Sequence, residues 1–259
     1  MNIDEIVIYG AGWRNLSLVD IHGYTSFTLW LCGCNLKCPF CHNWRLADND
    51  KEMCRQLNLS KLIEDLSASL TLIDFLHITG GEPLLQYTNL KRLLEYLVNT
   101  MNLKISINSN LTLYVAFSEM VKKDLIHHVA TDVKIPPYEL YGLTATLVER
   151  YWENFLKSLK LIGKHDLPLE LRIPVHKKLA SETLSKYINE VAKVLGDHVN
   201  RTIVVINPLL GKPVVTPRDQ LWCEENCFPP ESTLNNVAKF LRGLGFKKIV
   251  IKSSVSHPF

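Results

Sequence analysis

Short apolar runs typical of β-strands alternate with amphipathic helical segments along this chain, and this alternation limits the possible folds more than any other feature. The strand-like runs are rich in β-branched and aromatic residues and lie at 25–31, 74–79, 103–108, 128–135, 169–175, 201–207 and 247–252. Helical periodicity falls between them, at 60–72, 89–99, 144–162, 181–195 and 232–244. This order predicts parallel strands joined by crossover helices.

Periodicity does not separate an open doubly wound sheet from a barrel, and both place the active site at the carboxyl ends of the strands. The 259 residues fit a single α/β barrel. A chain of this length buries roughly three quarters of its unfolded surface, so disulfides are not needed for stability.

Composition excludes several classes of protein. Hydrophobic residues make up 47% and charged residues 21%, which excludes disordered and collagen-like chains. A net charge of +3 is too small to indicate binding to nucleic acid or to an anionic membrane. No run approaches the roughly 20 apolar residues of a membrane helix, and the first residues lack a secretory pattern. We therefore expect a cytoplasmic protein whose cysteines are reduced thiols, metal ligands or redox groups.

Three cysteines are closely spaced directly after the first predicted strand. Cys34, Cys38 and Cys41 form a C-x3-C-x2-C pattern, so three thiolates on one loop can converge on one metal centre. Pro39 stiffens this loop, and Gly33 allows close backbone approach. A cubane [4Fe–4S] cluster normally takes four cysteines, so three would leave one iron open to another ligand. An open iron is a catalytic arrangement.

Two other interpretations of these cysteines are a structural zinc site and a set of buried thiols. A zinc site would use His42 as the fourth ligand, but His42 adjoins Cys41, and closed zinc sites usually consist of two separated ligand pairs. Free cysteines are often buried as small apolar residues, but three at this spacing argue against a packing role alone. An iron–sulfur site is favoured.

A second motif, Gly80-Gly81-Glu82-Pro83, ends the next predicted strand. Two glycines at a strand end let the backbone approach a ligand closely, and Glu82 can accept hydrogen bonds from a cationic amine. Together with the cysteine pattern, in which Phe40 fills the aromatic position before the last cysteine, this motif resembles the radical S-adenosylmethionine (radical SAM) superfamily.

Within that superfamily the chain is most similar to the glycyl-radical-enzyme activating enzymes, such as those for pyruvate formate-lyase and anaerobic ribonucleotide reductase. The similarity covers roughly residues 16–210 and is strongest over 27–44. Asn108-Ser109-Asn110-Leu111 lies where the group has D-T-N-G, so Asn108 and Leu111 depart from the pattern. Asp132-Val133-Lys134 matches a D-x-K motif, Arg172 lies where the group has a cofactor-contacting arginine, and Asn207 lies near a cofactor-contacting histidine.

The resemblance implies an α/β fold: a partial (β/α)6-type parallel barrel with the cluster-binding loop after the first barrel strand. It implies one domain over 1–259, with a core of about 16–210 and a C-terminal extension of about 211–259. The implied cofactors are a [4Fe–4S] cluster and S-adenosylmethionine. The implied cluster ligands are Cys34, Cys38 and Cys41. The implied cofactor contacts are Phe40, Gly80, Gly81, Glu82, Ser109, Asn110, Asp132, Lys134, Arg172 and Asn207. Glu82 and the glycines are expected at the cofactor amine, Lys134 at its carboxylate, and Ser109 and Asn110 at its ribose, with no catalytic residue beyond the cluster and cofactor.

The resemblance also implies an activity. An electron from the reduced cluster would cleave S-adenosylmethionine, and the 5′-deoxyadenosyl radical would remove a glycine Cα hydrogen from a partner enzyme such as anaerobic ribonucleotide reductase. A flavodoxin or ferredoxin would donate the electron. One alternative is a radical SAM enzyme acting on a small molecule, of the 7-deazaguanine-precursor synthase type. The other is a non-catalytic iron–sulfur electron carrier.

The remaining cysteines are Cys32, Cys54, Cys223 and Cys227. Cys223 and Cys227 stand at helical i, i+4 spacing and could bind a metal with other ligands, form a redox disulfide or stay free. A second cluster from all four is awkward, because Cys32 lies two residues from Cys34. Cys54 has no motif around it, so we expect its substitution to leave the cleavage of S-adenosylmethionine close to unchanged.

Overall fold

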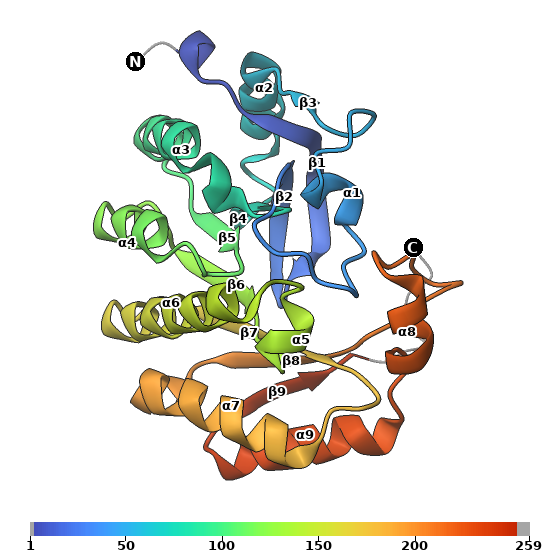
Figure 1. Cartoon of the computed structure of the whole chain (residues 1–259). Helices are drawn as coiled ribbons and strands as arrows, with labels where there is room; N and C mark the ends of the chain where they lie inside the picture. The colour runs from blue at the N-terminus through green and yellow to red at the C-terminus, as the bar shows by residue number, and fades with distance from the viewer. Residues whose placement is uncertain (1–2, 253–259) are drawn as a thin grey trace. The chain divides into compact units, whose positions relative to one another are not determined.

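The computed structural model describes residues 3–252 and divides them into two compact units (Figure 1). The first unit contains the described residues up to 35 together with 45–130, and the second contains 36–44 together with the described residues from 131. The expected single domain with a core of about 16–210 stays a prediction.

The first unit is built on strands in the order β3-β1-β2-β4-β5-β6. Their bounds are β1 Tyr9–Ile21, β2 Tyr24–Leu31, β3 Arg55–Gln56, β4 Phe75–Gly80, β5 Ile105–Asn108 and β6 His128–Asp132, of which residues 128–130 belong to the first unit and 131–132 to the second. β1 is antiparallel to β2 and β3, whereas β2, β4, β5 and β6 pair in parallel. The parallel strands are joined by crossover helices, as the sequence pattern predicts.

The helices of the first unit are η1 Ile3–Glu5, α1 Trp44–Ala47, α2 Leu59–Ser69, η2 Pro83–Gln86, α3 Tyr87–Met101 and α4 Tyr114–Lys122. Figure 1 shows α3 and α4 on the same side of β4 and β5. Leu90, Leu93, Leu94 and Leu97 are all buried, because the 3.6-residue period places them on one face of α3. The α2 helix begins after Asn58, whose side-chain oxygen accepts a hydrogen bond from the Lys61 amide at 3.0 Å.

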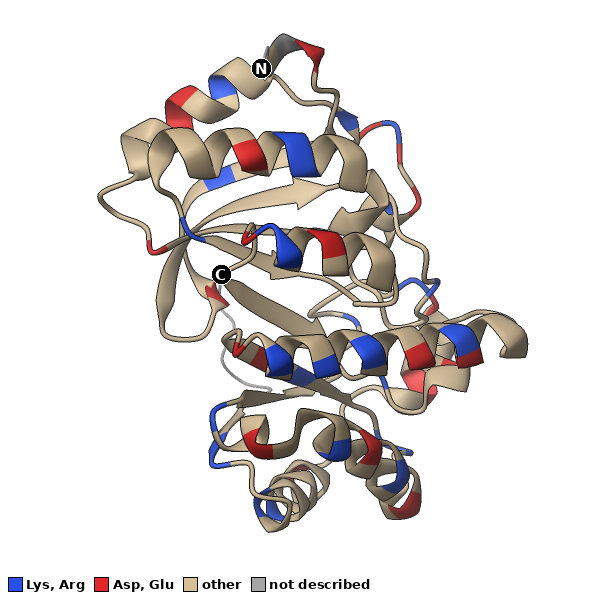
Figure 2. Cartoon of the chain, turned by 90° about the vertical axis from the view of Figure 1, so that its left-hand side faces the viewer, with Lys and Arg blue, Asp and Glu red and all other residues tan. Residues whose placement is uncertain are grey.

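The second unit carries three parallel strands in the order β7-β8-β9, with bounds Leu169–Val175, Ile203–Pro208 and Lys248–Ile251. Its helices are α5 Pro137–Leu140, α6 Ala145–Lys164, α7 Ser181–Leu195, η3 Gly196–Asn200, α8 Gln220–Asn226 and α9 Glu231–Gly243. Figure 2 shows that basic and acidic residues alternate along several of the helices. No helix among residues 3–252 is long and apolar enough to cross a membrane.

The α/β class and the parallel strands are confirmed. All six strands expected for a partial (β/α)6-type barrel form, as β2, β4, β5, β6, β7 and β8, and so does the additional strand β9. Within the described part of each unit the strands do not close on themselves, so the sheet is open. The cysteine segment follows β2, the first of the parallel strands, as expected.

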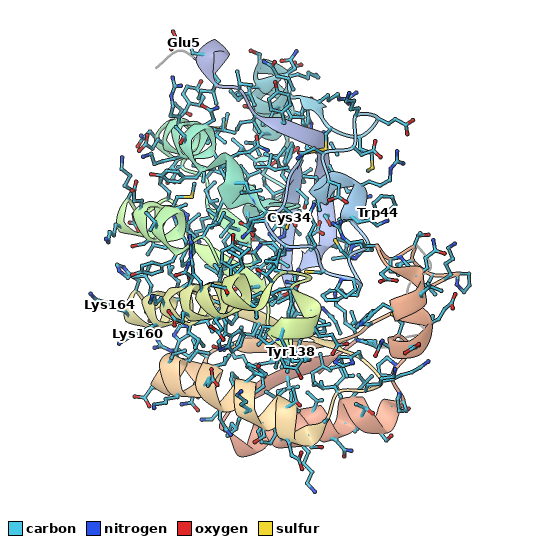
Figure 3. The ribbon with its side chains drawn as sticks, in the orientation of Figure 1. Glu5, Cys34, Trp44, Tyr138, Lys160 and Lys164 are labelled. Carbon is cyan, nitrogen blue, oxygen red and sulfur yellow. A yellow bond between two sulfur atoms is a disulfide. The ribbon has the colours of Figure 1, made fainter. Side chains whose placement is uncertain are left out.

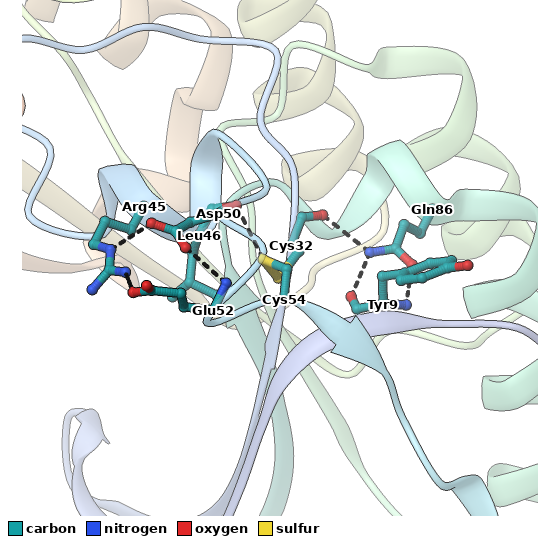
Figure 4. Close-up of a disulfide and its surroundings, with 8 residues drawn as sticks. All are labelled: Tyr9, Cys32, Arg45, Leu46, Asp50, Glu52, Cys54 and Gln86. Carbon is teal, nitrogen blue, oxygen red and sulfur yellow. Dashed lines mark hydrogen bonds and ion pairs between the residues drawn. A yellow bond between two sulfur atoms is a disulfide. The ribbon is translucent and has the colours of Figure 1, made fainter.

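Two disulfides join four of the seven cysteines. Cys32 pairs with Cys54 in the first unit, and Cys223 pairs with Cys227 in the second. Figure 4 shows the Cys32–Cys54 bond with Arg45, Asp50 and Glu52 on one side and Gln86 and Tyr9 on the other. The Gln86 amide donates to the carbonyl oxygens of Tyr9 and Cys32, at 2.7 and 3.0 Å. Cys54 is thus bonded within the first unit and is not a reduced thiol, whereas the expectation that its substitution leaves the cleavage of S-adenosylmethionine close to unchanged stays a prediction.

Cys54→Ala is expected to lower the free energy of unfolding by about 3 kcal/mol, since the bond closes a loop with a sequence separation of 22 residues. Cys227→Ala is the matched control. It opens a loop with a separation of only 4, so its expected cost is smaller, about 2 kcal/mol. Urea denaturation of both variants under non-reducing conditions measures the difference. An unchanged midpoint for Cys54→Ala would contradict the pairing.

Candidate functional site

Cys34, Cys38 and Cys41 are the three cysteines outside the two disulfides. Cys34 and Cys41 are half-buried and Cys38 is buried. The side chain of Cys34 is labelled in Figure 3. The three thiols have the chemistry that an iron–sulfur cluster requires, and the disulfides remove every other cysteine from competition for iron. No group of three His, Cys, Asp or Glu side chains within residues 3–252 is gathered closely enough to hold a metal ion. The assignment of the ligands is therefore a prediction that depends on their spacing.

Backbone hydrogen bonds within the second unit hold the Cys38–Cys41 segment. The Lys37 amide donates to the Tyr141 carbonyl at 2.9 Å, and the Arg218 amide donates to the Cys41 carbonyl at 3.0 Å. A Cβ on Gly142 would lie 2.1 Å from the Lys37 carbonyl oxygen, so only glycine fits there. Burial raises the pKa of the Cys41 thiol, and nearby Arg218 and Lys134 oppose that rise.

The Gly80-Gly81 pair presses against the backbone that leads into the cysteine segment. The Gly81 amide donates to the Leu31 carbonyl at 2.9 Å, and the Glu82 amide donates to the Gly33 carbonyl at 2.7 Å. A Cβ on Gly80 or Gly81 would lie 2.1 Å from the carbonyl oxygen of Leu31 or Gly33. This contact between two backbone segments requires glycine at both positions, whether or not a ligand also contacts them.

Glu82 is fully buried, and its carboxylate accepts three hydrogen bonds from within the first unit. Oε1 accepts from the Leu84 amide at 3.0 Å and from the Ser109 hydroxyl at 2.8 Å, and Oε2 accepts from the Asn110 amide at 2.7 Å. Glu82 thus caps η2 and fixes the loop that follows β5. Its contact with a cofactor amine, and the contacts of Ser109 and Asn110 with a ribose, stay predictions.

The loop after β5 adopts its shape without the glycine that the D-T-N-G pattern would supply. Leu111 takes that place with a φ of 57°, a left-handed conformation that costs a bulky residue on the order of 1 kcal/mol. The Leu111 amide donates to the Ser109 hydroxyl at 3.0 Å, and the Leu111 side chain is completely buried. Asn108, in place of the acidic residue, donates to Thr79 Oγ1 at 3.0 Å.

Sequence reasoning missed two residues of this region, Asn35 and Thr112. The Asn35 amide donates to Thr112 Oγ1 at 2.7 Å, and Asn35 Oδ1 accepts from Asn110 Nδ2 at 2.8 Å. The only signal in the sequence is that Asn35 is a polar residue directly after Cys34, inside the cysteine motif.

Charged residues gather on the second unit at the positions of the D-x-K motif and the expected arginine. Lys134 Nζ lies 3.0 Å from Asp132 Oδ2, and Arg172 Nε lies 2.6 Å from Glu170 Oε1. Burial acts to raise the pKa of Asp132, but the positive charges of Lys134 and Arg172 outweigh it and hold this pKa below its ordinary value. Asp132 therefore lies close enough to Lys134 and Arg172, the two predicted basic contacts, for their charges to stabilise its carboxylate.

The last two predicted contacts, Phe40 and Asn207, also lie in the second unit. The Phe40 ring lies 6.4 Å from that of Trp222, over a small apolar cluster that includes Cys223 and Cys227. Asn207 is the second-to-last residue of β8, and its Oδ1 is buried without a hydrogen-bond partner among the described residues. A buried, unsatisfied acceptor fits a ligand that donates to it.

Comparison with known proteins agrees with the motifs. The model of the radical SAM superfamily matches residues 29–191, which is more than half of the chain. A Methanocaldococcus jannaschii protein, provisionally named a glycyl-radical enzyme activating enzyme, is 28% identical over 189 residues, which cover 72% of this chain and 75% of that protein. A 7-carboxy-7-deazaguanine synthase of Hyperthermus butylicus is 36% identical over 94 residues, or 34% of this chain and 35% of the relative. The crystal structure of a domain of a pyruvate-formate lyase-activating enzyme from Bacteroides vulgatus superposes with a TM-score of 0.48 at 16% identity, covering 69% of this chain and 99% of that domain.

Proposed function

This chain belongs to the radical SAM superfamily, and we propose that it is an activating enzyme that installs a glycyl radical on a partner enzyme. Its cofactors are a [4Fe–4S] cluster and S-adenosylmethionine. When bound, they supply a 5′-deoxyadenosyl radical by one-electron reductive cleavage of S-adenosylmethionine, with release of methionine. The chain itself binds and orients the cofactors and excludes water.

The observation that carries the proposal is the set of thiols left by the two disulfides. They are Cys34, Cys38 and Cys41, the three cysteines of the motif. Three thiolates would hold three irons, and the amine and carboxylate of S-adenosylmethionine would occupy the fourth. Lys134 and Arg172 offer positive charge to the carboxylate.

The proposed partner is a glycyl radical enzyme, because the M. jannaschii relative, which this chain matches over 75% of that protein's length, is provisionally named an activating enzyme for such enzymes. Anaerobic ribonucleotide reductase is the first partner to test, with a flavodoxin or ferredoxin as the electron donor. Glycine suits such a step, since its lack of a side chain lets a peptide loop enter a narrow site.

The experiment is anaerobic reconstitution, with iron analysis and detection of 5′-deoxyadenosine, followed by addition of a candidate reductase. We expect about four irons per chain, reductive cleavage of S-adenosylmethionine, and an organic radical signal on the reductase that is lost when its glycine is changed. Cleavage without a radical on any glycyl radical enzyme would overturn the assignment as an activating enzyme. Stoichiometric zinc in protein isolated without oxygen would overturn the cluster itself.

A second candidate is a synthase that forms a 7-deazaguanine precursor from a small molecule. The similarity of about a third of the chain to the H. butylicus protein favours it. This candidate predicts conversion of a small-molecule substrate by the reconstituted protein with no partner enzyme present. A simple electron carrier would show neither reaction and would not cleave S-adenosylmethionine.

A further inference from the structure

We propose that Asn110 is a positioning residue that donates an N–H···S hydrogen bond to the Cys34 sulfur and thereby raises the reduction potential of the cluster. The inference rests on the proposed function, in which Cys34 is a cluster ligand. Asn110 Nδ2 lies 4.0 Å from Cys34 Sγ, and both residues belong to the first unit. This separation is at the long end for a sulfur acceptor, so the orientation of the amide decides whether a bond forms.

Three side chains fix that orientation by forming a closed ring of hydrogen bonds. The Thr112 hydroxyl donates its single hydrogen to Asn110 Oδ1 at 2.7 Å and accepts from Asn35 Nδ2 at 2.7 Å. Asn35 Oδ1 in turn accepts from Asn110 Nδ2 at 2.8 Å. A flip of either amide would place two donors or two acceptors against each other, so each amide has one favourable orientation.

The ring leaves one N–H of Asn110 for Cys34. The oxygen of Asn110 is used by the hydroxyl and the amide of Thr112, the latter at 3.0 Å. Asn110 Nδ2 donates one hydrogen to Asn35 Oδ1 at 2.8 Å and lies 4.0 Å from Cys34 Sγ, so its second hydrogen is the one available to the sulfur. The amide therefore presents a donor to Cys34, and its acceptor is turned away.

The backbone of Asn110 is held independently of the ring. Its amide donates to Glu82 Oε2 at 2.7 Å, and the neighbouring Ser109 hydroxyl donates to Glu82 Oε1 at 2.8 Å. The Thr112 side chain is completely buried. The donor is thus in place before any cofactor binds, so a cluster formed at Cys34 would meet an organised dipole.

A donor at a ligating sulfur stabilises the more negative state of the cluster. Reduction adds one electron, and hydrogen bonds to the sulfurs are among the factors that set cluster potentials. Substitution of a partner that hydrogen-bonds a ligand typically costs roughly 10- to 100-fold in metal affinity or activity. Removing the Asn110 amide should therefore make the cluster harder to reduce.

The test compares Asn110→Leu, Thr112→Val and the wild-type chain by redox titration followed by electron paramagnetic resonance. Leucine keeps the approximate shape of asparagine without a donor. For Asn110→Leu we expect the iron content of the wild-type chain and a midpoint potential of the cluster that is lower by about 59 mV. This shift corresponds to a tenfold smaller equilibrium constant for one-electron reduction. Thr112→Val, which breaks the ring and keeps Asn110, should lower the midpoint less. Asn89→Leu is the matched control: its amide donates to the Val7 carbonyl at 2.8 Å in the same unit, and the midpoint should not change.

The outcomes separate this inference from the proposed function. A wild-type chain that takes up no four-iron cluster overturns the proposed function and the inference together. A full cluster with a wild-type midpoint in Asn110→Leu overturns only the inference. If Asn110→Leu loses its cluster, Thr112→Val decides, and an unchanged midpoint in that variant overturns the role of the ring.

Discussion

Cys38→Ala is expected to abolish the reductive cleavage of S-adenosylmethionine. Cys38 is one of only three cysteines outside the disulfides, and it is buried, so no other thiol of the chain is available to replace it. A cluster with two protein ligands would be held loosely and lost during reconstitution. The measurement is iron per chain together with 5′-deoxyadenosine formed under reducing, anaerobic conditions.

Cys227→Ala is the matched control for this loss of activity. Cys227 is also buried in the second unit, but its sulfur is bonded to Cys223. Its substitution should leave the iron content near that of the wild-type chain. Cleavage at the wild-type rate by Cys38→Ala would show that Cys38 is not a ligand.

Glu82→Ala is expected to destabilise the folded protein by at least about 3 kcal/mol, even without cluster or cofactor. The substitution leaves the Leu84 amide, the Ser109 hydroxyl and the Asn110 amide without an acceptor in a fully buried position. Each unsatisfied buried donor costs about 1–3 kcal/mol. Urea denaturation of the metal-free protein measures this loss.

Glu82→Gln should cost less, because the amide oxygen still accepts while the amide nitrogen opposes one of the three donors. If Glu82 served only to bind the cofactor amine, both variants would unfold at the wild-type urea concentration when metal-free. S-adenosylmethionine binding is measured on the same samples. A loss of stability in metal-free Glu82→Ala would show that Glu82 stabilises the fold through its hydrogen bonds and does not serve only to contact the cofactor.

The parallel strands could be predicted because their apolar runs are short, dense and separated by clear helical periods. β1 could not, because its sequence lacks an alternating pattern. Gly10 and Gly12 interrupt it, and Arg14, Asn15 and Leu16 are exposed in succession. The register of β1 against β2 shifts in this region, which explains the loss of alternation.

The cysteine and GGEP motifs could be found from spacing alone, since the residues of each motif are close in the sequence. The direction in which Glu82 points could not, because its donors Ser109 and Asn110 come from a loop after another strand. The same limit applies to the ring of Asn35, Asn110 and Thr112 and to the Cys32–Cys54 pair. Such contacts depend on which strands become neighbours, and no local pattern encodes them.

The two disulfides have a consequence for how the protein should be loaded with iron. While they are closed, a solution of iron and sulfide meets three reactive sulfurs on each folded chain. A strong dithiol reductant opens both bonds and raises the number of competing sulfurs to seven. Cys32, only two positions from Cys34, would then compete with its neighbour for the same iron. Reconstitution without excess dithiol should give the more homogeneous cluster, and misloaded iron should increase with the dithiol concentration.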